Sequence, residues 1–564
     1  MTWNSPTEIA AARWPDLEPA FDELLARPLD ADTVERWLAD WSRLEEILTE
    51  AIAIAMIAYT GDTADPDKEA AHRRFAIEIA PRADEKSVQL AARFAALGWS
   101  RPDLEQTIAR FRRSIEMFRA ANVPLAAQLE ATSAEYQQIA GGLLAEWDGE
   151  KKPVPQLSPF LENPDRLVRE RAFRSAVQPY LEAREALVAL FDRQFALRQQ
   201  VAANAGFGDF QAYSFAAKCR FDYGPADCVR LHDAVEAVVV PAVSRLHTRR
   251  QERLGVAQLR PWDLAVSLHR QQPLRPFTTG AELQAKAARL FQRLDPTLGE
   301  QFQTMIAEQL LDLESRMGKA PGGYCDTLHF RGRPFIFMNG VGVMEDVQTL
   351  LHEAGHAFHA FASDAQPLIW QRHPTAESAE LASMSMELLA APLLDAPDAF
   401  LTARDATVAR LEHLEETLVT LCHIATVDAF QSWLYTSGEG GVSSARDAAW
   451  LRIRSRFEPV VDWSGLTAER VARWYRQIHI FLYPFYYIEY GIAQLGALQV
   501  WLNHRRDPEA ALVAYRRFLA LGATAGLPDL YRAAGARLVF DREALEPLVE
   551  ALEAEAERLR GSLG

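Results

Sequence analysis

Two histidines and a glutamate at helical spacing form the residue group best suited to chemistry. His352 and His356 lie four residues apart in the stretch LLHEAGHAFHAF, so on a helix both imidazoles project from one face. Two such imidazoles can bind one Zn²⁺ at about 2.0–2.1 Å. Glu353 follows the first histidine, where its carboxylate can take a proton from a zinc-bound water. Because the surrounding residues are apolar and buried charge needs a partner, the motif predicts a catalytic zinc site.

A catalytic zinc site needs a third protein ligand and keeps one position open for water. Three glutamates of a second helical segment are candidates: Glu377, Glu380 and Glu387. The last two are seven residues apart and therefore share a helix face, and the first lies one turn earlier. One can bind the metal while another orients a ligand imidazole by hydrogen bonding. Spacing alone leaves the choice open, and a solvated surface charge is the alternative for each.

A second group, of polar aromatic residues, lies further along the chain. On one helix His479, Tyr483, Tyr486 and Tyr490 would lie within about 60° of one another and could point into a cleft. Peptide hydrolysis passes through a tetrahedral oxyanion, and one donor to that oxygen is worth roughly 10²–10³ in rate. The alternative is a core aromatic stripe with satisfied hydroxyls. Pro484 is expected to divide the stripe into two helical pieces.

The segments HEAGHAFHAF and PTAESAELASMSMELL resemble the oligoendopeptidase F and Pz-peptidase branch of the thimet oligopeptidase family. The pattern of that branch is HExGHxxH followed by AE[IL]xSxxxE, and here it places Glu380 24 residues after His356. The resemblance implies one Zn²⁺ per chain, bound by His352, His356 and Glu380. It also implies that Glu353 is the catalytic base.

Three further residues near the motif match the same family. Glu387 and Glu377 match acidic residues after and before the implied glutamate ligand, in positions that support the metal ligands from behind. His359, one turn beyond His356, matches the family's third histidine. We expect it to make a structural hydrogen bond and not to bind the metal.

The segment HIFLYPFYYIEYGIAQ is similar to the family's HxxxxPFYYxxY element, whose histidine and tyrosines contact substrate and stabilise the transition state. The resemblance implies catalytic roles for five residues, the first two above all: His479, Tyr490, Tyr483, Tyr486 and Tyr487. Upstream, PFIFMNG resembles the family's edge strand beside the cleft. It implies that an extended peptide is held by strand addition at Phe337, Asn339 and Gly340.

The elements that must position these residues are mostly helices. Almost the whole chain has apolar residues at helical spacing and is rich in good helix formers. The exception, 329–338, predicts a small mixed sheet just before the zinc motif. The proline-rich segment 151–159 predicts a linker between an N-terminal helical region, 1–155, and a helical catalytic region, 156–564. The predicted fold is mainly α, and the resemblance adds two interleaved helical lobes around a deep channel with the metal at its floor.

Composition excludes several classes of protein. The 564 residues carry 60 Lys+Arg against 77 Asp+Glu, and a net charge of −17 argues against a nucleic-acid partner. An apolar share of 49% excludes global disorder. The first 20 residues lack the pattern of a signal peptide, and the longest early apolar run is too short to cross a bilayer, which takes about 20 residues. The four cysteines form no CxxC pair, so we expect a cytoplasmic protein without membrane partners.

These features together predict a zinc-dependent endopeptidase that uses a zinc-bound water activated by Glu353. The resemblance implies that its substrates are short unstructured peptides, because only these enter the channel. Two alternatives stay open. One is another zinc hydrolase, such as an aminopeptidase or a deacylase. The other is a helical protein that binds peptides without cleaving them.

Overall fold

The structure, a computed structural model, describes residues 3–563 and contains two compact units, each built from separate stretches of the chain. Unit 1 comprises Met1–Phe118, Pro273–Ala406 and Ala493–Leu538, and unit 2 comprises Arg119–Gln272, Thr407–Ile492 and Val539–Gly564. The ranges 1–155 and 156–564 stay a prediction. Residues 1, 2 and 564, at the ends of these ranges, lie outside the described residues.

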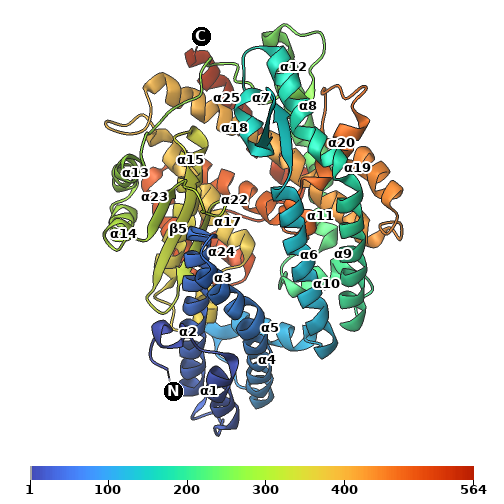
Figure 1. The fold of residues 1–564 in the computed structure, drawn as a ribbon. Coiled ribbons are helices and arrows are strands. Elements are labelled where there is room, and N and C mark those ends of the chain that lie inside the picture. Colours follow the sequence, from blue (N-terminus) through green and yellow to red (C-terminus); the bar gives the residue numbers. More distant parts are fainter. Residues whose placement is uncertain (1–2, 564) are drawn as a thin grey trace. The chain divides into compact units, whose positions relative to one another are not determined.

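Helices dominate both units, which confirms the predicted mainly α fold class (Figure 1). The helices of unit 1 are α1 (Trp14–Ala26), α2 (Val34–Gly61), α3 (Pro66–Arg73), α4 (Ala80–Leu97), α5 (Glu105–Met117), α13 (Gly280–Leu294), α14 (Pro296–Ala307), α15 (Met344–Ser363), α16 (Ile369–Arg372), α17 (Ala376–Ala390), α23 (Pro508–Leu521) and α24 (Leu527–Ala533). Those of unit 2 are α6 (Val123–Gly141), α7 (Ser158–Leu161), α8 (Arg166–Glu182), α9 (Arg184–Asn204), α10 (Phe210–Ala217), α11 (Pro225–Ala234), α12 (Val240–Leu254), α19 (Ser443–Phe457), α20 (Thr467–Tyr475), α21 (Ile478–Phe481) and α25 (Arg542–Leu563).

Two long helices contain the limits between the units. These are α18 (Ala403–Thr436) and α22 (Tyr487–Arg506). Between residues 3 and 563, no helix combines the length and the apolar character that crossing a membrane requires.

The predicted mixed sheet lies in unit 1, directly before the helix of the zinc motif. Its strands are β3 (Leu311–Glu314), β4 (Tyr324–Leu328) and β5 (Arg333–Gly340), in the order β3-β5-β4. β5 runs parallel to β3 and antiparallel to β4. The expectation of an edge strand at Phe337 is therefore wrong, because β5 is the central strand and the outer strands are β3 and β4. Strand order depends on pairing between distant segments, which the local pattern does not encode.

One carboxylate holds the turn between β5 and α15. Asp346 Oδ2 accepts hydrogen bonds from the backbone N–H groups of Val341, Gly342 and Val343 at 2.8, 2.8 and 2.9 Å. Gly342 has a φ of 92°, a left-handed conformation that glycine adopts without strain. Asp346 itself stands in the first turn of α15, where the helix dipole favours a negative charge. The end of the strand and the start of the helix are thus tied together.

α17 packs closely against α15 because a glycine faces it. A Cβ atom at Gly355 would lie 2.5 Å from the Cα of Ser383 and 2.7 Å from the carbonyl oxygen of Ala382. These distances are shorter than real Cβ contacts, so only glycine allows the two backbones to approach this closely. The approach brings the side chains of the two helices to a common site.

In unit 2 the only described strands are β1 (Leu144–Trp147) and β2 (Glu150–Pro153), which form an antiparallel hairpin. The segment 151–159 contributes to β2 and to the short helical turns that follow, and Val154 and Leu157 are buried. The prediction of a linker here is wrong. Its prolines occupy the end of a strand and the first positions of two short helices, where a backbone N–H is not needed.

Candidate metal centre

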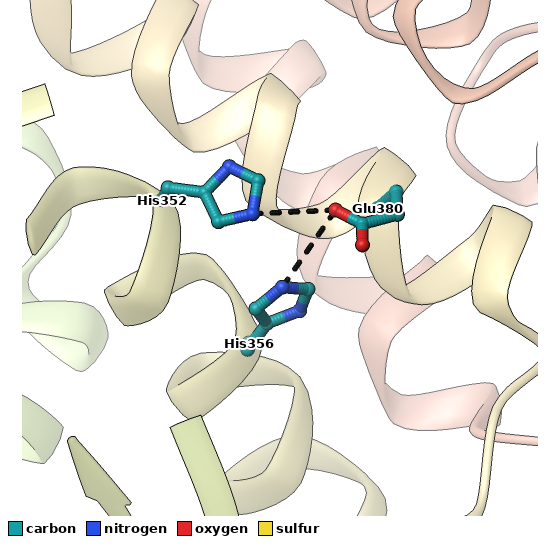
Figure 2. A group of neighbouring side chains, drawn as sticks. All are labelled: His352, His356 and Glu380. Carbon is teal, nitrogen blue, oxygen red and sulfur yellow. Dashed lines mark ion pairs between the residues drawn. The ribbon is translucent and has the colours of Figure 1, made fainter. Parts of the chain in front are cut away.

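Two helices of unit 1 bring the predicted metal ligands together. His352 and His356 project from α15 and Glu380 from α17 (Figure 2). One potential ligand atom from each residue lies within 4.8 Å of the others. Glu380 Oε2 is 3.2 Å from His352 Nε2 and 3.8 Å from His356 Nε2. Of the three candidate glutamates, Glu380 is the one that faces both imidazoles, and its role as a ligand stays a prediction.

Glu387 holds His352 from the opposite side. His352 Nδ1 lies 2.7 Å from Glu387 Oε1, so this nitrogen donates to the carboxylate and Nε2 is directed at Glu380. A carboxylate that accepts from one imidazole nitrogen fixes the ring and leaves the other nitrogen as a metal ligand. This is the supporting position that the resemblance implied for Glu387.

The donor set fits a divalent cation. In a tetrahedral site with bonds of about 2.0–2.2 Å, neighbouring ligand atoms lie about 3.3 Å apart. The separations of 3.2 and 3.8 Å between the carboxylate oxygen and the two imidazole nitrogens are close to that value. Burial lowers the pKa of His352, but the carboxylates of Glu380 and Glu387 raise it well above its ordinary value. The local field thus favours a positive charge at this point.

Glu353 lies beside the group and does not belong to it. Its side chain is buried, and the backbone of Cys325 in β4 lies near enough to lower the pKa of the carboxylate slightly. Burial raises the pKa of Glu353 to about 7, with His352 lowering it and the carboxylates of Glu380 and Glu387 raising it. A carboxyl with a pKa near 7 can both accept and return a proton at neutral pH.

Glu377 and His359 do not belong to the group of three potential ligand residues. Glu377 is buried on α17, and its backbone carbonyl accepts a 3.5 Å hydrogen bond from Tyr531. His359 is buried against Phe518, with ring centroids 5.4 Å apart. The structural hydrogen bond expected for His359 is not found, because neither ring nitrogen has a partner among the described residues. Burial lowers the pKa of His359 to about 3, so the imidazole is neutral.

The three residues predicted to bind substrate lie on β5. Phe337 is buried and stacks on Tyr324, with ring centroids 4.9 Å apart. Asn339 donates from its side-chain amide to the carbonyl oxygens of Ala320 and Gly322. Gly340 is the last residue of the strand and pairs with β3. Their contacts with substrate stay a prediction.

The predicted aromatic group gathers around one imidazole in unit 2. The rings of Tyr487, Tyr486, Tyr483 and Tyr490 lie 4.7, 5.8, 5.9 and 5.9 Å from that of His479. The expected break of the stripe is confirmed, because α21 ends at residue 481 and α22 begins at residue 487. The connection between them includes a residue with a φ of 61° at position 485. Tyr483 is half exposed and the other members are more buried.

The sequence patterns predicted no role for Gln477, whose side chain contacts the central imidazole of this group, His479. The side chain of Gln477 lies between His423 and His479, 3.0 Å from Nε2 of the first and 3.4 Å from Nδ1 of the second. No local signal marks the pair, since Gln477 and His423 are 54 residues apart in the chain.

Comparisons with known proteins point to one peptidase family. A model of peptidase family M3 matches residues 160–550. Oligoendopeptidase F of Lactococcus lactis subsp. cremoris is 25% identical over 149 residues, or 26% of this chain and 24% of that relative. An oligoendopeptidase F homologue of Borreliella burgdorferi is 21% identical over 388 residues, or 65% of this chain and 61% of that relative. The chain thus matches less than two thirds of the length of these curated relatives.

A solved structure matches over almost the full length. Pz peptidase A, determined with an inhibitor, superposes with a TM-score of 0.88 at 27% sequence identity. The match covers 97% of this chain and 98% of that chain.

Proposed function

The chain belongs to peptidase family M3, and on this basis we propose that it is a zinc-dependent endopeptidase that hydrolyses short unstructured peptides. The family match and the similarity to oligoendopeptidase F support a metalloendopeptidase. One observation carries the proposal. His352, His356 and Glu380 offer three ligand atoms within 4.8 Å of one another, with Glu353 beside them.

The metal would be held by His352, His356 and Glu380, with Glu387 fixing the first imidazole. A bound Zn²⁺ supplies Lewis-acid polarisation of the scissile carbonyl and lowers the pKa of a water molecule from about 15.7 toward about 7. Glu353 accepts the proton of the attacking water and then returns it to the leaving amine. The backbone of Cys325 in β4 lies beside the Glu353 carboxylate and favours its ionised form.

Peptide binding by strand addition is proposed at β4, not at β5. β4 is an outer strand of the sheet, and its residue Cys325 contacts the proposed base. An extended peptide paired with an outer strand presents its carbonyl groups at fixed intervals. Phe337, Asn339 and Gly340, the residues predicted to hold the peptide by strand addition, would then lie on the neighbouring strand β5.

The aromatic group is proposed to stabilise the transition state. We assign to His479 and Tyr490 the donation of hydrogen bonds to the oxygen that becomes negative, with Tyr483, Tyr486 and Tyr487 as further substrate contacts. The resemblance supports these roles, and so does the gathering of all four tyrosine rings around His479. Burial raises the pKa of Tyr487, so its phenol stays protonated and can donate.

The test is a product map with a matched metal analysis. The purified protein is analysed for bound metal and then mixed with a library of short peptides, half of them acetylated and amidated at their ends. Internal cleavage of the blocked peptides, lost with a chelator and restored by Zn²⁺, is the expected result. Cleavage confined to free amino ends would identify an aminopeptidase, and binding without products would identify a silent peptide-binding protein.

A further inference from the structure

A chain of hydrogen bonds leads through unit 2 to His479. Its central member is Gln477, whose Oε1 lies 3.0 Å from His423 Nε2 and whose Nε2 lies 3.4 Å from His479 Nδ1. The Gln477 side chain also hydrogen-bonds the phenol of Tyr487. One amide therefore contacts both a predicted catalytic imidazole and its nearest tyrosine.

Arg454, at the other end of this series of hydrogen bonds, determines which atoms donate. Arg454 Nη1 lies 3.3 Å from His423 Nδ1, and a guanidinium can only donate. His423 Nδ1 must therefore accept. Burial and the charges of Arg454 and Arg473 lower the pKa of His423 to about 3, against a smaller opposite effect of Glu458, so the ring is neutral and carries its one hydrogen on Nε2.

The donor and acceptor roles at His423 then determine those of Gln477. Because His423 Nε2 donates, the atom of Gln477 that faces it must be the carbonyl oxygen Oε1. The amide nitrogen of Gln477 is thus the end that faces His479, and it donates to Nδ1. A neutral imidazole that accepts at Nδ1 carries its hydrogen on Nε2.

The guanidinium of Arg454, the first donor in the series, is held by an ion pair with Glu458. Arg454 Nη2 lies 2.7 Å from Glu458 Oε1, and both side chains are less than one tenth exposed. Arg470 and Arg473 also pair with Glu458, at 3.2 and 3.5 Å. The guanidinium of Arg454 is therefore fixed from behind, and its Nη1 stays directed at His423.

We propose that Arg454, His423 and Gln477 are positioning residues that fix His479 in the tautomer with hydrogen on Nε2, so that this nitrogen is a hydrogen-bond donor. The kinetic part of this inference rests on the proposed role of His479 in hydrolysis. The assignment of the tautomer does not, since it follows from contacts within unit 2. A donor at Nε2 can stabilise a developing negative oxygen, whereas a lone pair there would repel it.

The test reverses the polarity of the central amide. Gln477→Glu keeps the shape but offers only acceptors, so His479 should change to the tautomer with hydrogen on Nδ1. Gln477→Met keeps the length without either partner and should give a mixture of tautomers. The control Gln211→Glu makes the same change at another buried glutamine of unit 2, where the hydroxyl of Ser432 can donate to the new carboxylate.

Tautomers are read by NMR of the full-length protein with ¹⁵N- and ¹³C-labelled histidine, and the His479 signals are assigned with His479→Gln. We expect hydrogen on Nε2 in the wild type and in Gln211→Glu, and on Nδ1 in Gln477→Glu. We also expect kcat of Gln477→Glu to fall at least about tenfold with KM nearly unchanged. A wild type with hydrogen on Nδ1, or a tautomer insensitive to Gln477→Glu, overturns the inference. A changed tautomer with unchanged kcat supports the positioning chain and contradicts the proposed role of His479.

Discussion

His352 donates from Nδ1 to Glu387 at 2.7 Å, and its other ring nitrogen is 3.2 Å from Glu380. The two glutamates are seven residues apart on α17, and they contact the two ring nitrogens of the same α15 imidazole. The ring cannot turn without losing one of these contacts. The orientation of the first metal ligand is thus set by the neighbouring helix and not by its own.

Replacing the supporting carboxylate should weaken metal binding. Glu387→Gln keeps the size but removes the charge that orients His352, and we expect the affinity for Zn²⁺ to fall about 10–100-fold. Competition with a fluorescent chelator measures it. Glu345→Gln, at an exposed site on α15, the helix of His352, is the control and should keep the wild-type affinity. Equal affinities of the two variants would contradict the supporting role.

Removing the proposed base should separate metal binding from turnover. In Glu353→Gln the amide cannot accept the proton of water, so we expect kcat to fall by roughly 10²–10⁴. The metal content should stay at the wild-type level, because the three ligands are intact. Elemental analysis and a quenched-peptide assay on the same preparation provide both values. Hydrolysis near the wild-type rate would remove Glu353 from the mechanism.

The glycine between the two helices should not tolerate even a methyl group. In Gly355→Ala the new Cβ would lie 2.5 Å from Ser383, so the helices must separate. We expect a loss of about 1–3 kcal/mol in stability, measured by urea unfolding, together with weaker metal binding. Gly561→Ala, in α25 with nothing within 4 Å of the new Cβ, should be neutral or slightly stabilising. Unchanged metal affinity in Gly355→Ala would show that the close packing does not position Glu380.

Loss of a single hydroxyl should test the aromatic group. We expect Tyr490→Phe to lower kcat by roughly 10²–10³ while KM changes little, because the proposed hydrogen bond strengthens only in the transition state. Tyr213→Phe, in another aromatic cluster of unit 2, is the control. If Tyr490→Phe raises KM and leaves kcat alone, the tyrosine binds substrate but does not stabilise the transition state.

One buried histidine should make the fold sensitive to acid. Burial lowers the pKa of His329 to about 2, assisted by the nearby His373 and Arg372, whereas in the unfolded chain it is about 6.5. Below pH 6.5 the unfolded chain therefore binds a proton that the folded chain does not. Stability falls as the pH falls, by up to about 1.4 kcal/mol per pH unit. In His329→Phe, urea unfolding between pH 7 and pH 4.5 should show a shallower decline. Parallel curves for the two proteins would refute this assignment.

The parts of the site that sequence predicts best are local. The four-residue spacing of His352 and His356 needs only one helix, so the sequence alone predicts that the two imidazoles lie together. The choice of Glu380 required the packing of α17 on α15, which depends on Gly355 and which spacing does not encode. In the same way the aromatic residues were found from their own helical spacing, and Pro484 correctly marked the break between α21 and α22.

Predictions that depended on long-range pairing were less successful. The composition of 329–338 correctly indicated a sheet, but the resemblance placed Phe337 on an edge strand, whereas the outer strands are β3 and β4. The segment 151–159 looked like a linker because prolines are common in linkers, whereas here they fit a strand end and helix starts. Gln477 was overlooked because its partner His423 lies on α18, far away in the sequence, whereas Gln477 lies between α20 and α21.

The carboxylate of Asp346 accepts hydrogen bonds from three successive backbone N–H groups between the end of β5 and the start of α15. The end of the strand and the start of the helix consequently share one anchor, the Asp346 carboxylate. Any displacement of the sheet on loading a peptide would shift both imidazoles along the helix axis together. A change in the register of β5 would thus displace the proposed metal ligands relative to the scissile bond, although no ligand residue is changed.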